Sequence, residues 1–258
     1  MIELSKNLRG KKLRRSNFLI AVFALLLVFG NRPLFCGCKL PEHLLTEVSA
    51  PLHLEQGDLA PVTAFLAAGA VCFAVDRTVN DGLASLRAQN LDLLKNADIF
   101  GDGYFTLGAA SVLYVLGGPK EKNTALNVAE SFIEAGLLTG VLKLGFGRRR
   151  PDSGSDAFTF EPFGFNSDSL PSGHTAVAFS TAAVLAKAYD IGYITYPLAA
   201  CVGFSRMYKE KHWLSDVFFG AVIGTLVGNL HEPEKEKDLK ATFEYNGTGM
   251  SFIISKNF

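Results

Sequence analysis

The sequence of 258 residues has little cysteine and little charge. Its four cysteines are too few for a disulfide scaffold, and its 19% of charged residues is below the roughly 25% usual in soluble domains. The formal net charge is zero, but residues 1–37 carry seven basic side chains against one acidic one, so the remainder has a net charge of −6. Because phosphate backbones select basic surfaces, this acidic body argues against a nucleic-acid partner. The 48% of hydrophobic residues excludes a disordered chain.

The N-terminus has the pattern of an export signal. A basic stretch from Lys11 to Arg15 precedes an uncharged run from Phe18 to Gly30. That run suits the apolar region of a signal peptide and is shorter than the ~20 residues of a membrane span. We therefore predict a signal peptide or signal anchor over 1–37, with Cys38 as a candidate lipidation residue. Export to the cell envelope follows, in a periplasmic or membrane-associated form, and a multi-pass inner membrane protein is the alternative.

The body of the chain has the apolar spacing of helices. We predict an all-α six-helix bundle over 62–231, because six apolar runs alternate with polar or Gly- and Pro-containing segments. The predicted helices are Val62–Val75, Tyr104–Leu116, Ala125–Leu144, His174–Tyr189, Ile191–Phe204 and Val217–Leu230.

Three further segments complete the predicted organisation. Residues 38–61 contain several prolines and indicate a loop-rich lead-in. Residues 77–103 are expected to add a polar amphipathic helix. Residues 232–258 form a charged connector and a small C-terminal β-hairpin, because Asn246 and Gly247 are a strong turn signal between two strand-like runs.

Three short segments gather the residues able to do chemistry. The first runs from Lys143 to Arg150 and Pro151, the second is Pro171–His174, and the third is Ser205–Asp216. Each lies at a boundary between predicted helices. In an antiparallel bundle with short connections these boundaries fall at one end, so the segments are expected to converge on one face.

The residue types of this face suit a phosphate group. Lys143, Arg150 and Arg206 supply a point charge and two planar guanidinium forks, which bind tetrahedral oxyanions. Ser172 and Gly173 directly precede a helix, where free backbone N–H groups and the helix dipole favour an anion.

The two histidines of these segments suit acid–base and nucleophilic roles. His212 and Asp216 are four residues apart and share a face if helical, so the carboxylate can hold one imidazole nitrogen protonated and leave the other free to attack. His174 is then placed across the anion to protonate a leaving oxygen.

These segments resemble the type 2 phosphatidic acid phosphatase / vanadium haloperoxidase superfamily, which includes exported bacterial acid phosphatases. The patterns Lys-x6-Arg-Pro, Pro-Ser-Gly-His and Ser-Arg-x5-His-x3-Asp are all present in order. The resemblance implies that His212 is the nucleophile forming a phosphohistidine, that Asp216 orients it and that His174 is the general acid. It also implies phosphate binding without a metal or cofactor by the remaining five residues, which are Lys143, Arg150, Ser172, Gly173 and Arg206.

The leading function is therefore metal-independent hydrolysis of phosphomonoesters or lipid phosphates, with membrane association. Vanadate-dependent halide oxidation in the same pocket and a non-catalytic envelope role are the alternatives. Added vanadate separates the first two, because inhibition supports the phosphatase and peroxide-dependent halogenation supports the haloperoxidase.

The other polar residues are assigned no catalytic role. Arg148 and Arg149 fall in the variable stretch of the first segment and are expected to be solvated or lipid-facing. Asp98 and Asp102 are expected to be turn and capping residues. Trp213 is expected to pack in the protein interior, and Cys72 and Cys201 are expected to be buried thiols. Glu130 and Glu134 are expected to form tertiary hydrogen bonds or to face solvent. His231 is expected at the surface or in a loop.

Overall fold

The structure is a computed structural model that describes residues 59–89, 95–164, 168–233, 239–245 and 250–256. The predicted signal segment over 1–37, and the predicted lead-in except for its last residues, lie outside this part of the chain. Six α-helices fall within it. They are α3 (Leu59–Arg87), α5 (Gly103–Leu116), α6 (Pro119–Phe146), α7 (Gly173–Tyr189), α8 (Gly192–Tyr208) and α9 (Leu214–Leu230).

The predicted helical bundle is confirmed for the part of the chain that the structure describes. Each predicted apolar run lies within one of the six helices, apart from the first residue of the fifth run. The separate amphipathic helix over 77–103 is wrong, because α3 begins at Leu59 and continues without a break to Arg87. A short 3-10 helix, η3 (Ala97–Gly101), then leads into α5, and Asp102 caps α5 by accepting a hydrogen bond from the Tyr104 amide at 2.8 Å.

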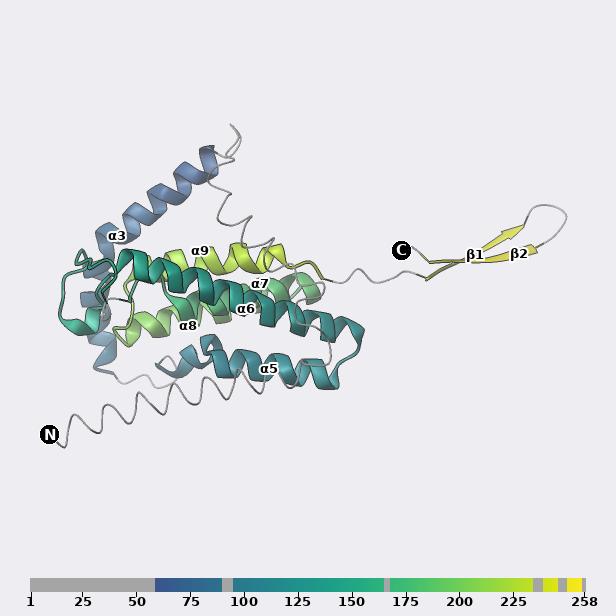
Figure 1. The fold of residues 1–258 in the computed structure, drawn as a ribbon, viewed down its shortest axis with the longest axis horizontal. Coiled ribbons are helices and arrows are strands. Elements are labelled where there is room, and N and C mark those ends of the chain that lie inside the picture. The colour runs from purple at the N-terminus through teal and green to yellow at the C-terminus, as the bar shows by residue number, and fades with distance from the viewer. Residues whose placement is uncertain (1–58, 90–94, 165–167, 234–238, 246–249, 257–258) are drawn as a thin grey trace.

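The two strands lie at the C-terminal end of the chain. Strand β1 (Leu239–Tyr245) pairs antiparallel with β2 (Met250–Lys256), and Phe243 lies opposite Phe252 in the register. Figure 1 shows the pair beyond the end of α9. The turn predicted at Asn246 and Gly247 lies outside the described residues.

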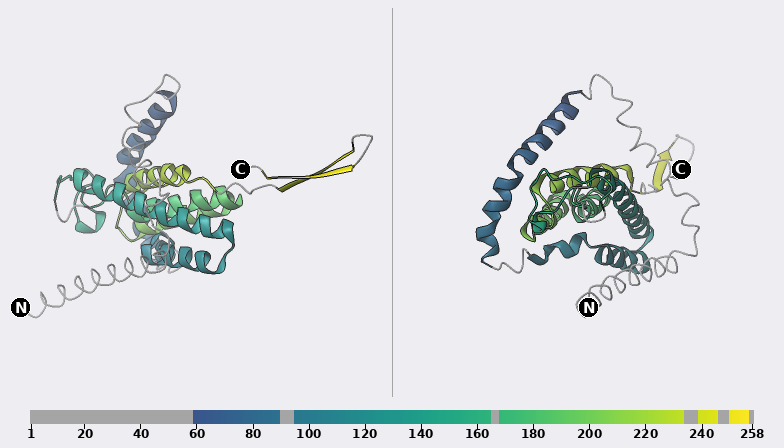
Figure 2. Two further views of the ribbon diagram at one scale, coloured as in Figure 1. Left: turned by 45° about the vertical axis from the view of Figure 1, so that its right-hand side comes forward. Right: turned by 60° about the vertical axis from the view of Figure 1, so that its left-hand side comes forward.

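Helix α7 is the centre of the bundle. It packs against α6, α8 and α9, and α5 lies on the outer side of α6. The five helices α5–α9 lie along one another, whereas α3 crosses them obliquely and packs on α9 and α8 (Figures 1 and 2).

A stripe of glycines brings α9 unusually close to α7. A Cβ at Gly220 would lie 2.5 Å from the carbonyl oxygen of Ser172, and one at Gly224 would overlap the carbonyl oxygen of Ala176. Gly228 meets Ser180 in the same way one turn further on. The glycines therefore allow backbone-to-backbone contact along three turns, and they fix the start of α9 against the start of α7.

Aromatic side chains hold α3 on this helix pair. The Phe65 ring lies 5.6 Å from Phe218 and 5.4 Å from Phe219 between centroids, and Phe73 lies 5.9 Å from Phe219. These contacts place the next turn of α3, which carries Asp76, beside the start of α9.

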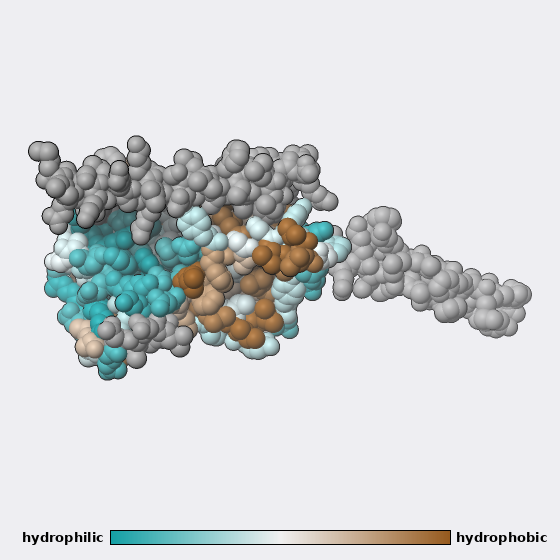
Figure 3. Space-filling model, turned by 90° about the horizontal axis from the view of Figure 1, so that it is seen from below, coloured by the Kyte–Doolittle hydropathy of each residue, from teal (hydrophilic) through white to brown (hydrophobic). Residues whose placement is uncertain are grey.

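The bundle exposes many large apolar side chains. They include Val112, Val115 and Leu116 on α5, Val141 and Leu144 on α6, and Tyr193, Ile194 and Leu198 on α8. Figure 3 shows apolar residues on one half of the lower face and hydrophilic residues at the other end. Among the described residues, two helices, Ala60–Arg87 and Pro119–Phe146, are long and apolar enough to cross a membrane by length and composition, a test that the core helices of soluble proteins also pass.

The glycine stripe gives a direct test of the helix packing. The substitution Gly224→Ala should lower the free energy of unfolding by about 1–3 kcal/mol, because the new methyl group meets the α7 backbone. The matched control is Gly140→Ala on α6, where a Cβ meets nothing within 4 Å. That variant should be neutral or more stable by up to about 1 kcal/mol. Equal effects of the two substitutions in thermal or denaturant unfolding would contradict the packing described here.

Candidate active site

The three predicted segments come together at one end of the bundle. Helix α6 ends at Phe146, and Gly147 adopts the left-handed conformation with φ of 58°. A side chain at Gly147 would overlap the backbone of Glu161, so glycine is required there. The turn sends the chain back across the bundle end, and the short 3-10 helix η4 (Pro151–Ser153) follows.

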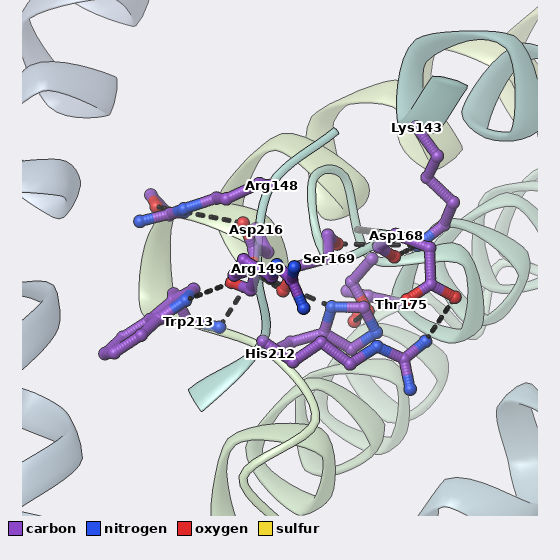
Figure 4. Close-up of polar contacts among 12 residues, drawn as sticks. Lys143, Arg148, Arg149, Asp168, Ser169, Thr175, His212, Trp213 and Asp216 are labelled. Atoms are coloured by element: carbon purple, nitrogen blue, oxygen red, sulfur yellow. Dashed lines mark hydrogen bonds and ion pairs between the residues drawn. The ribbon is translucent and has the colours of Figure 1, made fainter. Parts of the chain in front are cut away.

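Lys143 and Gly173 are neighbours across the first two segments. The Lys143 Cε atom lies 3.9 Å from the position that a Cβ on Gly173 would take, so the lysine crosses the start of α7. Its Nζ donates to the carbonyl oxygen of Asp168 and, at 3.4 Å, to that of Ser169. Arg150 joins the same group, because its Nη2 donates to Asp168 Oδ2 at 2.8 Å. Figure 4 shows Lys143 beside Asp168.

Arg206 is held by a carboxylate from another element. Its Nη1 donates to Asp98 Oδ2 at 2.8 Å, and Lys209 Nζ donates to Asp98 Oδ1 at 2.6 Å. Burial alone would raise the pKa of Asp98, but the hydrogen bonds and charges of Lys209 and Arg206 outweigh it and lower the pKa. Asp98 is therefore an ion-pair partner of a predicted phosphate-binding residue, a role beyond the turn expected from the sequence.

Unpaired buried donors are concentrated at this end. Within the described part of the chain, six buried side-chain polar atoms have no hydrogen-bond partner, and three of them are Arg150 Nε, Arg206 Nε and His212 Nδ1. An unpaired buried N–H group costs about 1–3 kcal/mol. Two guanidinium donors left unpaired in this way are what an oxyanion would satisfy.

His212 and Asp216 are buried together at the start of α9. The His212 Nδ1 atom lies 3.7 Å from Asp216 Oδ2, beyond hydrogen-bond distance, and the other ring nitrogen, Nε2, remains for chemistry. Burial lowers the pKa of His212 to about 3, and the charges of Lys143 and Arg150 act in the same direction against Asp216. Burial, followed by the charge of Arg206, lowers the pKa of His174 to about 4. Both imidazoles are therefore neutral at pH 7 in the free site.

Asp216 has a full set of donors around its carboxylate. Oδ1 accepts from Arg148 Nη1 at 2.6 Å, while Oδ2 accepts from Ser169 Oγ at 2.5 Å and from the Trp213 amide at 2.8 Å (Figure 4). Burial would raise its pKa, but His212, Arg148 and Ser169 lower it further than burial raises it. The carboxylate is therefore ionised and fixed.

The start of α7 is tied to the same residue. The Ser172 amide donates to the Asp216 carbonyl oxygen at 2.9 Å. Ser172 is fully buried, and its hydroxyl accepts from Thr175 Oγ1 at 2.8 Å. The first turn of α7, with its amides free of intrahelical partners, therefore lies beside His212 and Asp216.

Several sequence expectations for residues other than the predicted catalytic and phosphate-binding ones need correction. Arg148 is fully buried rather than solvated or lipid-facing, whereas its neighbour Arg149 is partly exposed and pairs with Glu161. His231 is buried rather than a surface residue, and its Nε2 lies 3.0 Å from Glu134 Oε2. Cys201 is exposed rather than a buried thiol. Trp213 packs as expected and is buried.

Asp76 is a functional candidate that the sequence analysis missed. It is fully buried and bonds to Arg148 and Ser215. The one signal that could have found it is a lone carboxylate directly after the apolar run that ends at Val75. A charge inside an apolar helix is costly unless it is paired, so its position implies a partner.

Sequence comparison supports the family suggested by the motifs. The family model of the PAP2 superfamily matches residues 124–231. The chain is 39% identical over 135 residues to the lipid A 1-phosphatase of Porphyromonas gingivalis. The aligned region covers 46% of this chain and 28% of that protein. It is 31% identical over 147 residues to the lipid A 1-phosphatase of Rhizobium johnstonii, covering 48% of this chain and 59% of that protein.

Two solved structures are also similar to this chain. The transmembrane PAP2 type phosphatidylglycerolphosphate phosphatase from Bacillus subtilis aligns with a TM-score of 0.48 and 20% identity, over 65% of this chain and 92% of that one. Aquifex aeolicus LpxE aligns with a TM-score of 0.46 and 27% identity, over 61% of this chain and 94% of the LpxE chain.

Residues 124–231 are therefore similar to the PAP2 superfamily, the type 2 phosphatidic acid phosphatases that the sequence motifs also resemble. The alignments span less than two thirds of the length of the curated relatives.

The lowered histidine pKa values predict how stability depends on pH. In the unfolded chain, His212 and His174 have the ordinary histidine pKa of 6.5 and are protonated as the pH falls below that value. In the folded protein, both side chains stay neutral until the pH approaches their lowered pKa values of about 3 and about 4. The unfolded state then holds more protons, so stability is lost as pH falls below 6.5, by at most about 1.4 kcal/mol per pH unit for each histidine. The melting temperature of the wild type should therefore fall between pH 6.5 and pH 4.5 more steeply than that of His212→Asn. Parallel pH profiles for the two proteins would contradict the assigned burial of a neutral His212.

Proposed function

We propose that this protein is a metal-independent phosphatase that hydrolyses a lipid phosphate through a phosphohistidine on His212. The observation that carries the proposal is that Arg150 Nε, Arg206 Nε and His212 Nδ1 are all buried without hydrogen-bond partners, while the charge of Arg150 acts on both Arg206 and His212. A phosphate group would accept from both guanidinium groups and would be approached by the imidazole.

The proposed reaction has two steps. The His212 Nε2 lone pair attacks phosphorus, the bond to the ester oxygen breaks, and that oxygen takes a proton from His174. Water then attacks the phosphohistidine and gives a proton to His174, which releases inorganic phosphate and restores His212. Lys143, Arg150 and Arg206 would stabilise the charge that builds on the phosphoryl oxygens.

The neutral state of His174 in the free site fits this sequence of events. A general acid must carry a proton, and burial keeps the pKa of His174 at about 4. An arriving phosphate dianion favours the charged form of a nearby imidazole and raises its pKa. Substrate binding would therefore charge the acid that the first step requires.

An apolar cavity supports a lipid as the carrier of the phosphate. A cavity of about 330 Å³ lies between η3, α5, α7 and α8 and is lined by residues such as Phe100, Ala109, Ala178 and Leu198. Its η3 end adjoins the site, because Gly101 packs on the carbonyl group of His174. The exposed apolar side chains of α5 and α8 suit membrane association in the cell envelope.

Loss of the nucleophile tests the mechanism. The substitution His212→Ala should abolish phosphate release, measured with EDTA present, while circular dichroism remains that of the wild type. His231→Gln is the matched control, because it changes a buried histidine that contacts Glu134 away from the motifs. This control should keep wild-type turnover. Full metal-independent activity of a folded His212→Ala protein would exclude the phosphohistidine mechanism.

The carrier of the phosphate can be tested through the cavity. Phosphate release should be compared for lipid A 1-phosphate, phosphatidic acid and a small soluble ester. The variant Ala109→Phe fills the cavity and should raise KM for the lipid phosphates by about tenfold, the effect of losing 1.4 kcal/mol of apolar contact. It should leave the soluble ester unaffected. Val112→Phe, on the exposed side of the same helix, is the control. An equal effect of Ala109→Phe on lipid and soluble substrates would rule out the cavity as the lipid site.

A further inference from the structure

Arg148 is a fully buried charge between two fully buried carboxylates. Its Nη2 lies 2.7 Å from Asp76 Oδ2, and its Nη1 lies 2.6 Å from Asp216 Oδ1. None of the three side chains has any exposed surface. Asp76 comes from α3, Arg148 from the turn after α6 and Asp216 from α9, so this cluster joins three distant parts of the sequence.

The five donors of Arg148 are all engaged. Besides the two carboxylates, Nε and Nη2 donate to the Ala157 carbonyl oxygen at 2.8 and 2.6 Å, and Nη1 donates to Ser215 Oγ at 2.6 Å. The guanidinium carbon lies 4.7 Å from the Phe73 ring centroid and 5.5 Å from that of Trp213. Arg148 therefore has no free donor for a phosphate group, although it lies two residues before the phosphate-binding candidate Arg150.

Asp76 reaches the site through Ser215. Its Oδ1 accepts from the Ser215 amide at 2.8 Å, and its Oδ2 accepts from Ser215 Oγ at 2.6 Å. Ser215 directly precedes Asp216 in the first turn of α9. The contacts thus fix both the backbone next to Asp216 and the guanidinium that holds its carboxylate.

We propose that Asp76, Arg148 and Ser215 are positioning residues for the His212–Asp216 pair and act on phosphoryl transfer through it, without contacting the substrate. The inference rests on the proposed function. With Oδ1 of Asp216 held by Arg148, Oδ2 is directed toward Ser169, the Trp213 amide and His212. A carboxylate held at both oxygens cannot rotate away from the imidazole.

The charges of the cluster favour the reaction intermediate. Asp76, Arg148 and Asp216 together carry −1 while His212 is neutral. Attack by Nε2 with a proton on Nδ1 makes the imidazole ring cationic, so the buried cluster and the ring become neutral together. A net negative cluster next to the ring therefore stabilises the intermediate more than the free enzyme, which is the condition for faster chemistry.

Arg148→Gln separates positioning from phosphate binding and from folding. A positioning role predicts a kcat lower by about 10- to 100-fold, the usual effect of removing an outer partner of an active-site ligand, with the Ki of inorganic phosphate within about twofold. Orthovanadate mimics the five-coordinate transition state and depends on His212, so its Ki should rise by about tenfold or more. Arg148→Lys keeps the charge and should recover part of kcat. Arg149→Gln is the matched control, because Arg149 pairs with Glu161 and should tolerate the change.

Asp76→Asn and Ser215→Ala complete the test and cover the case in which Arg148→Gln does not fold. Both should lower kcat and leave the Ki of inorganic phosphate unchanged. A folded Ser215→Ala or Asp76→Asn protein with wild-type kcat would overturn the proposal, as would an Arg148→Gln protein whose main change is weaker phosphate binding. An active His212→Ala protein would instead contradict the proposed function, so the two failures are distinguishable.

Discussion

The buried Arg148 guanidinium is the constraint around which the site is built. A charge with no access to water is tolerated only when it is paired and its donors are satisfied. Here that requirement is met by Asp76, Asp216, Ser215 and the Ala157 carbonyl group. Meeting it fixes α3, the loop after α6 and the start of α9 relative to one another. The position of the His212 imidazole follows from that arrangement.

The glycine stripe of α9 is a second constraint on the site, because it sets the distance between α7 and α9. Backbone contact at Gly220 and Gly224 draws α7 against α9, and the Ser172 amide then reaches the Asp216 carbonyl oxygen at 2.9 Å. The free amides of α7, the cations of the first segment and Arg206 thereby surround one region. Burial keeps the imidazoles neutral, and Arg150 Nε and Arg206 Nε have no hydrogen-bond partners, which is the state that the proposed function requires of a site that binds an anion.

Much of this arrangement could be predicted from the sequence, and the rest could not for identifiable reasons. The helices, and the gathering of Lys143, Ser172 and His212 at one end, follow from apolar runs and short connections. The role of Arg148 does not, because exposure cannot be inferred for one of three consecutive arginines. Asp76 is separated from its partners by about seventy residues or more along the chain. Pairings at that range depend on how α3 packs, which no local pattern encodes.

Trapping the covalent intermediate tests the central claim most directly. His174→Ala should still form the intermediate from a substrate whose leaving group needs no proton, but should hydrolyse it slowly, because the base for water is missing. After rapid quenching, mass spectrometry should find one phosphoryl group per chain, acid-labile and base-stable, on the peptide that contains His212. Turnover without such a species, or a phosphoryl group on another residue, would contradict the account.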